Sequence, residues 1–245
     1  MSHRTKLLTD VANQAVDGQW PQMVICPRAV RDGFVAMAVA GSLALGVVGC
    51  SGEGGAAKGN DNAVEAAQLC GGTALSADAA EGVEVITGSS RFDAPAEGST
   101  VARAARSLSE AFTSPAADDG DICQVFAVDA AQSDRLEVTW ELVSGPPKGE
   151  PAPKFTVLPM GERALTASDA AVVQFACRNE KLLGSQPAHV DIGVERWSPK
   201  EPEGDPEKLK DAYATVAHSV SLAMAKELGC ENNGGLQARP SLDPA

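Results

Sequence analysis

Alternation of apolar and polar residues predicts several β-strands in the second half of the chain. Residues 136–142 and 190–194 are apolar at every second position, which is typical of a strand with one face in water. Residues 123–128 and 171–177 are more continuously apolar and indicate interior strands, and residues 155–158 are a weaker candidate. Because antiparallel sheets are commonly covered on one face only, we expect the second face to be at least partly wet.

A period of three to four residues predicts helices on either side of these strands. The strongest spans 206–228, with Asp205 as its N-cap and Gly229 at its end. Shorter helices are predicted over 100–112 and 76–87. The order of elements favours an α+β fold, with an antiparallel sheet of about four to six strands and helices packed on one face.

The N-terminal region has the pattern of an export signal. Arg28 and Arg31 precede 17 uncharged, mostly apolar residues, 33–49. A transmembrane helix is the competing interpretation, but no cluster of Lys or Arg follows the apolar run as a stop-transfer flank. We therefore predict a signal peptide over 1–49. Met23 would start a signal of ordinary length, which favours translation from that residue.

The signal ends in a motif that predicts lipid attachment. Val47-Val48-Gly49-Cys50 resembles the bacterial lipobox, with Val where Leu is the usual first residue. The resemblance implies that the Cys50 thiol receives a diacylglycerol, that the chain is cut just before it, and that the protein stays on the outer face of the cytoplasmic membrane. Two or three acyl chains give lasting attachment. Residues 50–63, rich in Gly, Ala and Asn, are predicted to be a lipidated, flexible tether.

Charge narrows the choice of partners. The chain has 245 residues and a net charge of −13, from 20 Lys and Arg against 33 Asp and Glu. This balance argues against a nucleic-acid partner, because neutralising phosphates needs clustered cations.

We expect residues 64–230 to form one domain, and the polar residues 231–245 to be a disordered tail.

Four cysteines remain after lipidation and removal of the signal: Cys70, Cys123, Cys177 and Cys230. An even number in an exported chain predicts two disulfides, and no C-x-x-C spacing indicates zinc or thioredoxin-like chemistry. The order of elements favours Cys177–Cys230 with Cys70–Cys123, because the long helix would return the chain from the end of the 171–197 hairpin. Cys123–Cys177 with Cys70–Cys230 remains the alternative.

Few residues point to catalysis. The nucleophile-elbow, zincin, Walker and dinucleotide motifs are all missing from residues 50–245. His189 could pair with Asp191, two residues along a strand, although a solvent-facing histidine is the simpler interpretation. Trp197 could line a surface groove, with core packing favoured, and residues 118–121 are expected to be a solvated acidic turn. We predict no catalytic residue, cofactor or metal ion.

Several short segments carry a family resemblance. Together with the lipobox, the segments Leu69–Gly72, Ile122–Cys123, Gly161–Ala164 and Ala225–Cys230 resemble the small actinobacterial surface lipoproteins. The resemblance implies location and fold, and no activity. We expect a non-enzymatic module for binding an envelope protein or small ligand, or for envelope assembly. A surface hydrolase and a small solute-binding protein of a transporter are the alternatives.

Overall fold

The structure is a computed structural model that describes residues 62–114, 118–128, 130–131, 133–179, 182 and 186–245. The predicted signal peptide, Cys50 and nearly all of the predicted tether lie outside these residues. The described part begins two residues before the predicted start of the domain at Val64.

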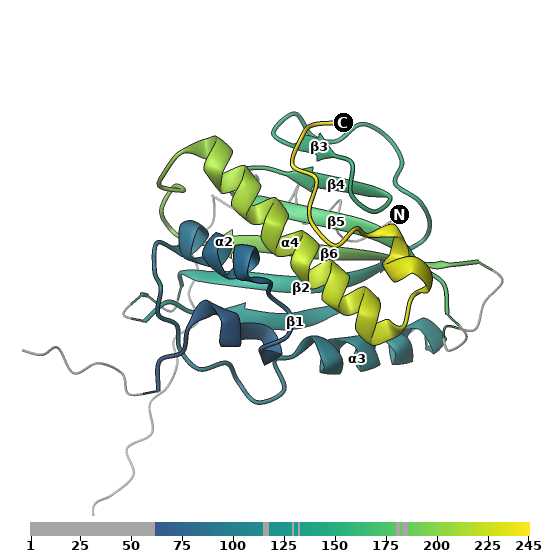
Figure 1. Cartoon of the computed structure of the whole chain (residues 1–245), viewed down its shortest axis with the longest axis horizontal. Coiled ribbons are helices and arrows are strands. Elements are labelled where there is room, and N and C mark those ends of the chain that lie inside the picture. The colour runs from purple at the N-terminus through teal and green to yellow at the C-terminus, as the bar shows by residue number, and fades with distance from the viewer. Residues whose placement is uncertain (1–61, 115–117, 129, 132, 180–181, 183–185) are drawn as a thin grey trace, which may run out of the picture. The chain divides into compact units, whose positions relative to one another are not determined.

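Six antiparallel strands form one sheet, in the order β1-β2-β6-β5-β4-β3 (Figure 1). The strands are β1 (Asp119–Val125), β2 (Arg135–Val143), β3 (Thr156–Leu158), β4 (Arg163–Thr166), β5 (Ala170–Cys177) and β6 (Ala188–Trp197). The predicted strands are all present. β4 was not predicted, because its four residues are too few to show an alternating pattern. β1 and β3 form the two edges of the sheet.

The helices lie on one side of the sheet, which confirms the predicted α+β fold (Figure 1). They are η1 (Ala66–Gly71), α2 (Ala77–Thr87), α3 (Val101–Thr113), α4 (Pro206–Leu228) and η2 (Glu231–Gly235), where η marks a 3-10 helix. α4 has the predicted bounds. Its N-cap Asp205 accepts hydrogen bonds from the Glu207 and Lys208 amides, and Gly229 ends it in the left-handed conformation.

The core lies between the sheet and α4. Val138 of β2 pairs with Val194 of β6, and Trp140 pairs with Ile192; all four side chains are buried. The middle of α4 is buried on every side, including the polar Ser219 and Ser221. Their hydroxyls donate to backbone carbonyls of Ala74 and Ala217, so this burial leaves both groups satisfied.

The two disulfides join Cys70 to Cys123 and Cys177 to Cys230, with Cα–Cα distances of 5.3 and 4.9 Å. This confirms the favoured pairing and excludes the alternative. The first bridge attaches η1 to β1 at the edge of the sheet. The second attaches Cys230, two residues after the end of α4, to the end of β5, because α4 runs back across the sheet as expected.

Residues 231–245 were expected to be a disordered tail, and this expectation is wrong. Gly234 and Leu236 are buried, and the Ala245 amide donates to the Val157 carbonyl at 3.0 Å. Gly234 lies so close to Phe175 that a Cβ at that position would approach its ring to 2.6 Å. The segment is polar in composition, but glycine and one leucine are enough to pack it against β5.

Candidate functional site

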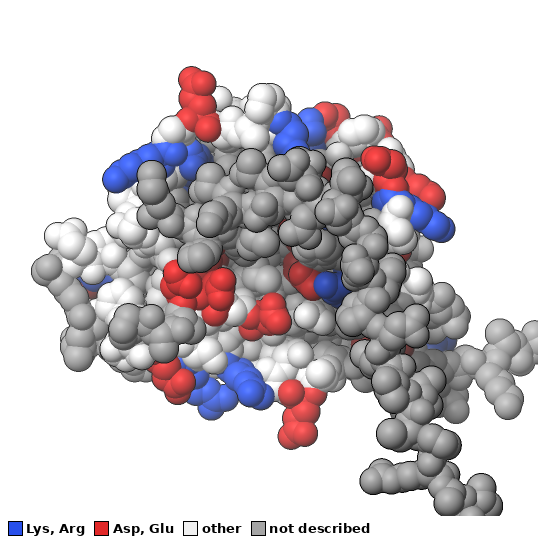
Figure 2. Space-filling model, turned by 180° about the vertical axis from the view of Figure 1, so that it is seen from behind, with Lys and Arg blue, Asp and Glu red and all other residues white. Residues whose placement is uncertain are grey.

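The sheet face opposite the helices carries paired carboxylates. Glu137 of β2 lies opposite Glu195 of β6, and Glu141 lies opposite Asp191. Seen from behind, several acidic side chains are visible near the middle of this face, with uncharged and basic residues beside them (Figure 2). Like charges in directly opposed positions destabilise a sheet. Arg135 offsets part of this repulsion, because its Nε donates to Glu137 Oε1.

Arg135 and Trp197 form a pair at one end of this face. They occupy opposed positions on β2 and β6, and the guanidinium carbon lies 5.6 Å from the centre of the indole. Arg135 Nε also donates to Glu137 Oε1 at 2.6 Å. Trp197 is 45% exposed, so the expectation of core packing is wrong. It falls on the face opposite the helices because it is in register with Arg135.

His189 pairs with a carboxylate that the sequence did not indicate. Its Nδ1 lies 2.7 Å from Glu162 Oε2, and the two side chains are 13% and 22% exposed. Glu162 precedes β4 and reaches His189 across β5, so the contact depends on the strand order. The pair fixes the orientation of the imidazole. In the described part of the chain, no group of three or more His, Cys, Asp or Glu side chains could hold a metal ion.

A second charged pair lies at the other end of β6. Arg196 donates from Nε and Nη2 to the two carboxylate oxygens of Asp134, each at 2.8 Å, and from Nη1 to the Ile86 carbonyl. The hydrogen bond from Arg196 lowers the pKa of Asp134. Because Ile86 belongs to α2, the guanidinium attaches that helix to the sheet, and we assign it a structural role.

His218 of α4 is a buried titratable group at 2% exposure. Burial lowers its pKa, and the backbone of Gln237 in the C-terminal segment partly opposes the shift by hydrogen-bonding the ring. Its Nε2 is buried without a hydrogen-bond partner. The C-terminal segment contributes to this burial, since the Gln237 backbone lies against the ring.

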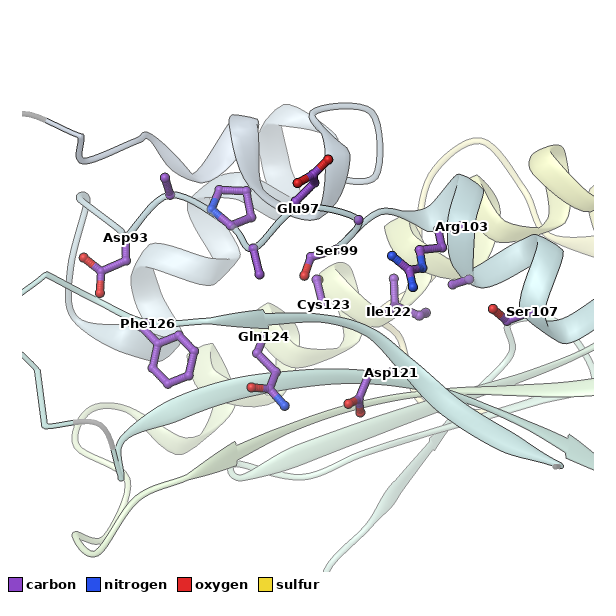
Figure 3. A pocket seen from close by; sticks show the side chains of 15 residues that line it. Asp93, Glu97, Ser99, Arg103, Ser107, Asp121, Ile122, Cys123, Gln124 and Phe126 are labelled. Atoms are coloured by element: carbon purple, nitrogen blue, oxygen red, sulfur yellow. The ribbon is translucent and has the colours of Figure 1, made fainter.

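A hollow borders the β1 edge (Figure 3). This cavity of about 480 Å³ lies between residues 93–99, α3 and β1. In the close-up, residues 93–99 run alongside the strand and Arg103 extends from α3 toward them. Further cavities of about 580 and 400 Å³ lie beside η1 and α2 and between α3 and α4. Neither Trp197 nor His189 lines any of these three.

The predicted acidic turn at residues 118–121 is mostly strand. Residues Asp119 to Asp121 belong to β1, where Asp119 pairs with Glu141 and Asp121 with Thr139. The prediction was wrong because pairing with β2 extends β1 beyond its apolar residues. Two carboxylates are thereby placed on an edge strand.

The other predicted site residues divide into two groups. Cys70, Cys123, Cys177 and Cys230 are all in disulfides, whereas Cys50 lies outside the described residues. No helix within the described residues is long and apolar enough to span a bilayer. Comparison of the chain with family models, with curated proteins and with solved structures finds no match in any of the three.

Proposed function

We propose that the chain is an actinobacterial-type lipoprotein, anchored by acylated Cys50 on the outer face of the cytoplasmic membrane. Its α+β domain would act there as a non-enzymatic module that binds an envelope protein or small ligand, or assists envelope assembly. The observation that carries the proposal is the pairing of all four cysteines of the domain. Disulfides persist in oxidising compartments outside the cytoplasm, and their pairing leaves Cys50 as the lipobox thiol.

Acylation of Cys50 is tested by metabolic labelling with an alkyne-bearing fatty acid in an actinobacterial host. We expect the wild-type protein to take up the label and to fractionate with membranes. Cys50→Ala should lose both properties, whereas Cys26→Ala, a matched change inside the predicted signal, should keep both. An unlabelled wild-type protein that fractionates like the Cys50→Ala variant would overturn the anchor.

The binding role is tested separately from the anchor. Crosslinking on intact membranes, followed by mass spectrometry, should recover the same envelope component with the wild type in repeated experiments. A soluble form that begins at Ser51 and is exported by an unrelated signal should recover it again when added back to membranes. Recovery of no reproducible component by either form would contradict a binding role.

A surface hydrolase is the second candidate, and the His189–Glu162 pair is the observation that favours it. An oriented imidazole can act as a general base, although a nucleophile or bound water must lie within hydrogen-bond reach. Screening the full chain against ester, amide and glycoside substrates tests this role. Activity that His189→Ala abolishes and Trp197→Ala preserves would establish the hydrolase in place of the binding module.

A solute-binding role has less support. Such proteins enclose their ligand between two lobes, and the described fold is a single sheet covered by helices on one face. Trp197, which could have lined such a cleft, lies near Arg135 at the end of the sheet and borders none of the three cavities described above.

A further inference from the structure

β1 is an edge strand whose outer side offers backbone hydrogen-bonding groups. The Leu142 amide donates to the Asp118 carbonyl. This hydrogen bond shows which residues of β1 direct their backbone groups toward β2. The register then shifts between Asp121 and Cys123, after which Cys123 pairs with Val138 and Val125 with Leu136. Since successive residues of a strand direct their backbone groups to opposite sides, the amide and carbonyl of Gln124 point away from β2.

A short strand-like segment already uses the same edge, immediately beyond β1. The Asp93 amide donates to the Phe126 carbonyl at 2.9 Å, and the Val128 amide donates to the Arg91 carbonyl at 3.0 Å. Continuing this antiparallel register would place residue 95 opposite Gln124. That residue is Pro95, which has no amide hydrogen to donate. The ladder therefore ends at the Asp93–Phe126 hydrogen bond, and none of the described residues continues it with a backbone hydrogen bond to Gln124.

The cavity of about 480 Å³ opens at this point, between β1 and residues 93–99 (Figure 3). We call it the β1 groove; it is lined by residues 93–99, Arg103, Ala104, Ser107, 121–124 and Phe126. Ile122 and Cys123 are buried and line it from the strand, whereas the Gln124 side chain is exposed. An extended segment placed here would have hydrogen-bonding groups on one side and apolar contacts below.

The charges around the β1 groove decide which segment fits. Glu97 and Asp121 are exposed at its two walls, and Arg103 is the one cation among its lining residues. A second copy of this chain would bring its own Asp119 and Asp121 against the same edge, and charged residues and a bulge on an edge strand disfavour such self-pairing. A positively charged segment meets one like charge, Arg103, against the three carboxylates of Asp93, Glu97 and Asp121.

We propose that the β1 groove binds an extended, positively charged peptide segment of a partner protein, which joins the edge of β1 as an additional strand opposite Gln124. Strand addition takes its affinity from main-chain hydrogen bonds and its specificity from alternate side chains. The inference names the partner class for the proposed binding role and rests on that role. It does not depend on the anchor at Cys50.

The test uses the full chain, labelled with ¹⁵N, and two peptides of alternating sequence. One is Lys-Val-Lys-Val-Lys-Val-Lys with blocked ends, and the other has Glu in place of every Lys. We expect the Lys peptide to bind about tenfold or more tightly than the Glu peptide, as charge complementarity requires. It should also slow hydrogen exchange at the Gln124 amide. Equal binding of both peptides, or unchanged exchange at Gln124, would overturn the proposal.

Gln124→Pro removes the outward amide and should weaken binding of the Lys peptide by about tenfold or more. Gln124→Thr keeps the amide in a residue that favours strands, and it should bind like the wild type. If Gln124→Pro fails to fold, the double variant Glu97→Lys, Asp121→Lys takes its place. It should reverse the preference toward the Glu peptide, and an unchanged preference would contradict the proposal.

The outcome also separates this groove from the wider binding role. If crosslinking recovers an envelope partner and Gln124→Pro leaves that recovery unchanged, the domain binds through another surface and the β1 groove is not the site. If no partner is recovered but the Lys peptide still protects the Gln124 amide, the groove binds strands and the envelope role fails. Self-association through β1, detected by ultracentrifugation and abolished by Gln124→Pro, would replace the cationic partner with a second copy.

Discussion

The His218 imidazole links the stability of the fold to pH. It is buried in α4, and burial holds its pKa below the ordinary value of 6.5. Below pH 6.5 the imidazole takes up a proton more readily in the unfolded chain than in the folded chain. Protonation therefore stabilises the unfolded state relative to the folded state. The contribution of His218 to stability is therefore complete above pH 6.5 and is lost as pH falls toward the lowered pKa.

We expect His218→Gln to flatten this part of the pH profile. Urea unfolding at several values between pH 7.5 and 5 should show the wild type losing stability toward acid, and the variant losing less. Asp134 serves as an internal reference, since its pKa is lowered from 3.8 and its stabilisation is lost only in more acidic solution. Identical profiles for wild type and variant between pH 7.5 and 5 would show that His218 does not titrate there.

Gly161 is a position where the backbone leaves no room for a side chain. Its φ is +59°, and a Cβ there would lie 2.3 Å from the Gln174 carbonyl oxygen. Gly88 has a similar φ of +70° but no atom within 4 Å of a Cβ. Gly88→Ala should therefore lower the free energy of unfolding by only about 1 to 2 kcal/mol, the cost of holding alanine in the left-handed conformation.

Gly161→Ala adds a steric clash to the same conformational cost. We expect it to lower the free energy of unfolding by about 3 kcal/mol or more, because overpacking alone costs about 1 to 3 kcal/mol. Chemical denaturation of both alanine variants in parallel measures the difference. Equal losses would mean that β5 moves aside without cost.

Local sequence signals account well for the helices. The bounds of α4 are those predicted, and α2 and α3 begin and end within one residue of their predictions. Caps explain this success, because Asp205, Ser76 and Thr100 each accept a hydrogen bond from a first-turn amide. A cap acts within a few residues, so its signal is complete in the local sequence.

The cap of α4 can be tested by two substitutions at one position. Asp205 Oδ1 accepts from the Glu207 and Lys208 amides at 2.9 and 3.3 Å. Asp205→Ala removes both bonds and should cost about 1 kcal/mol, whereas Asp205→Asn retains the acceptor and should cost much less. Thermal unfolding of the two variants measures this; a similar loss in both would assign the effect to charge.

Strands are less predictable because their partners lie far away in sequence. β1 was expected to begin at Cys123 and begins at Asp119, since pairing with β2 continues through its acidic residues. β4 has four residues and becomes a strand between β3 and β5. The His189–Glu162 contact likewise arises from strand order, so neither its existence nor its geometry could be read from residue spacing.

The C-terminal segment acts on the domain as a whole. Residues 231–245 contact β5 through Gly234, β3 through Ala245 and α4 through the Gln237 backbone beside His218. Leu236 is 5% exposed and belongs to the main core. The segment therefore lies beside α4 on the helix-bearing face of the sheet (Figure 1), and its removal should loosen several elements at once.

Deleting residues 236–245 tests this. Loss of the buried Leu236 alone should cost about 2 kcal/mol or more, judged from leucine truncation in cores. Deletion should also expose His218 and so reduce the pH dependence described above, whereas Leu236→Ala should preserve it. If the deletion leaves both the stability and its pH profile unchanged, the segment does not stabilise the domain and behaves as a disordered tail.

Composition, periodicity and capping residues were enough to predict the three α-helices, the antiparallel sheet, the covered face and the favoured cysteine pairing, because each of these depends on short-range chemistry or on the order of elements. Packing between distant segments decided the rest: the C-terminal segment beside His218, the exposure of Trp197, the partner of His189, and the groove beside Gln124. The groove exists because residues 93–99 and β1, which pair at Asp93 and Phe126, enclose a cavity beyond that point. Such juxtapositions have no local signal, since the residues that create them are dozens of positions apart.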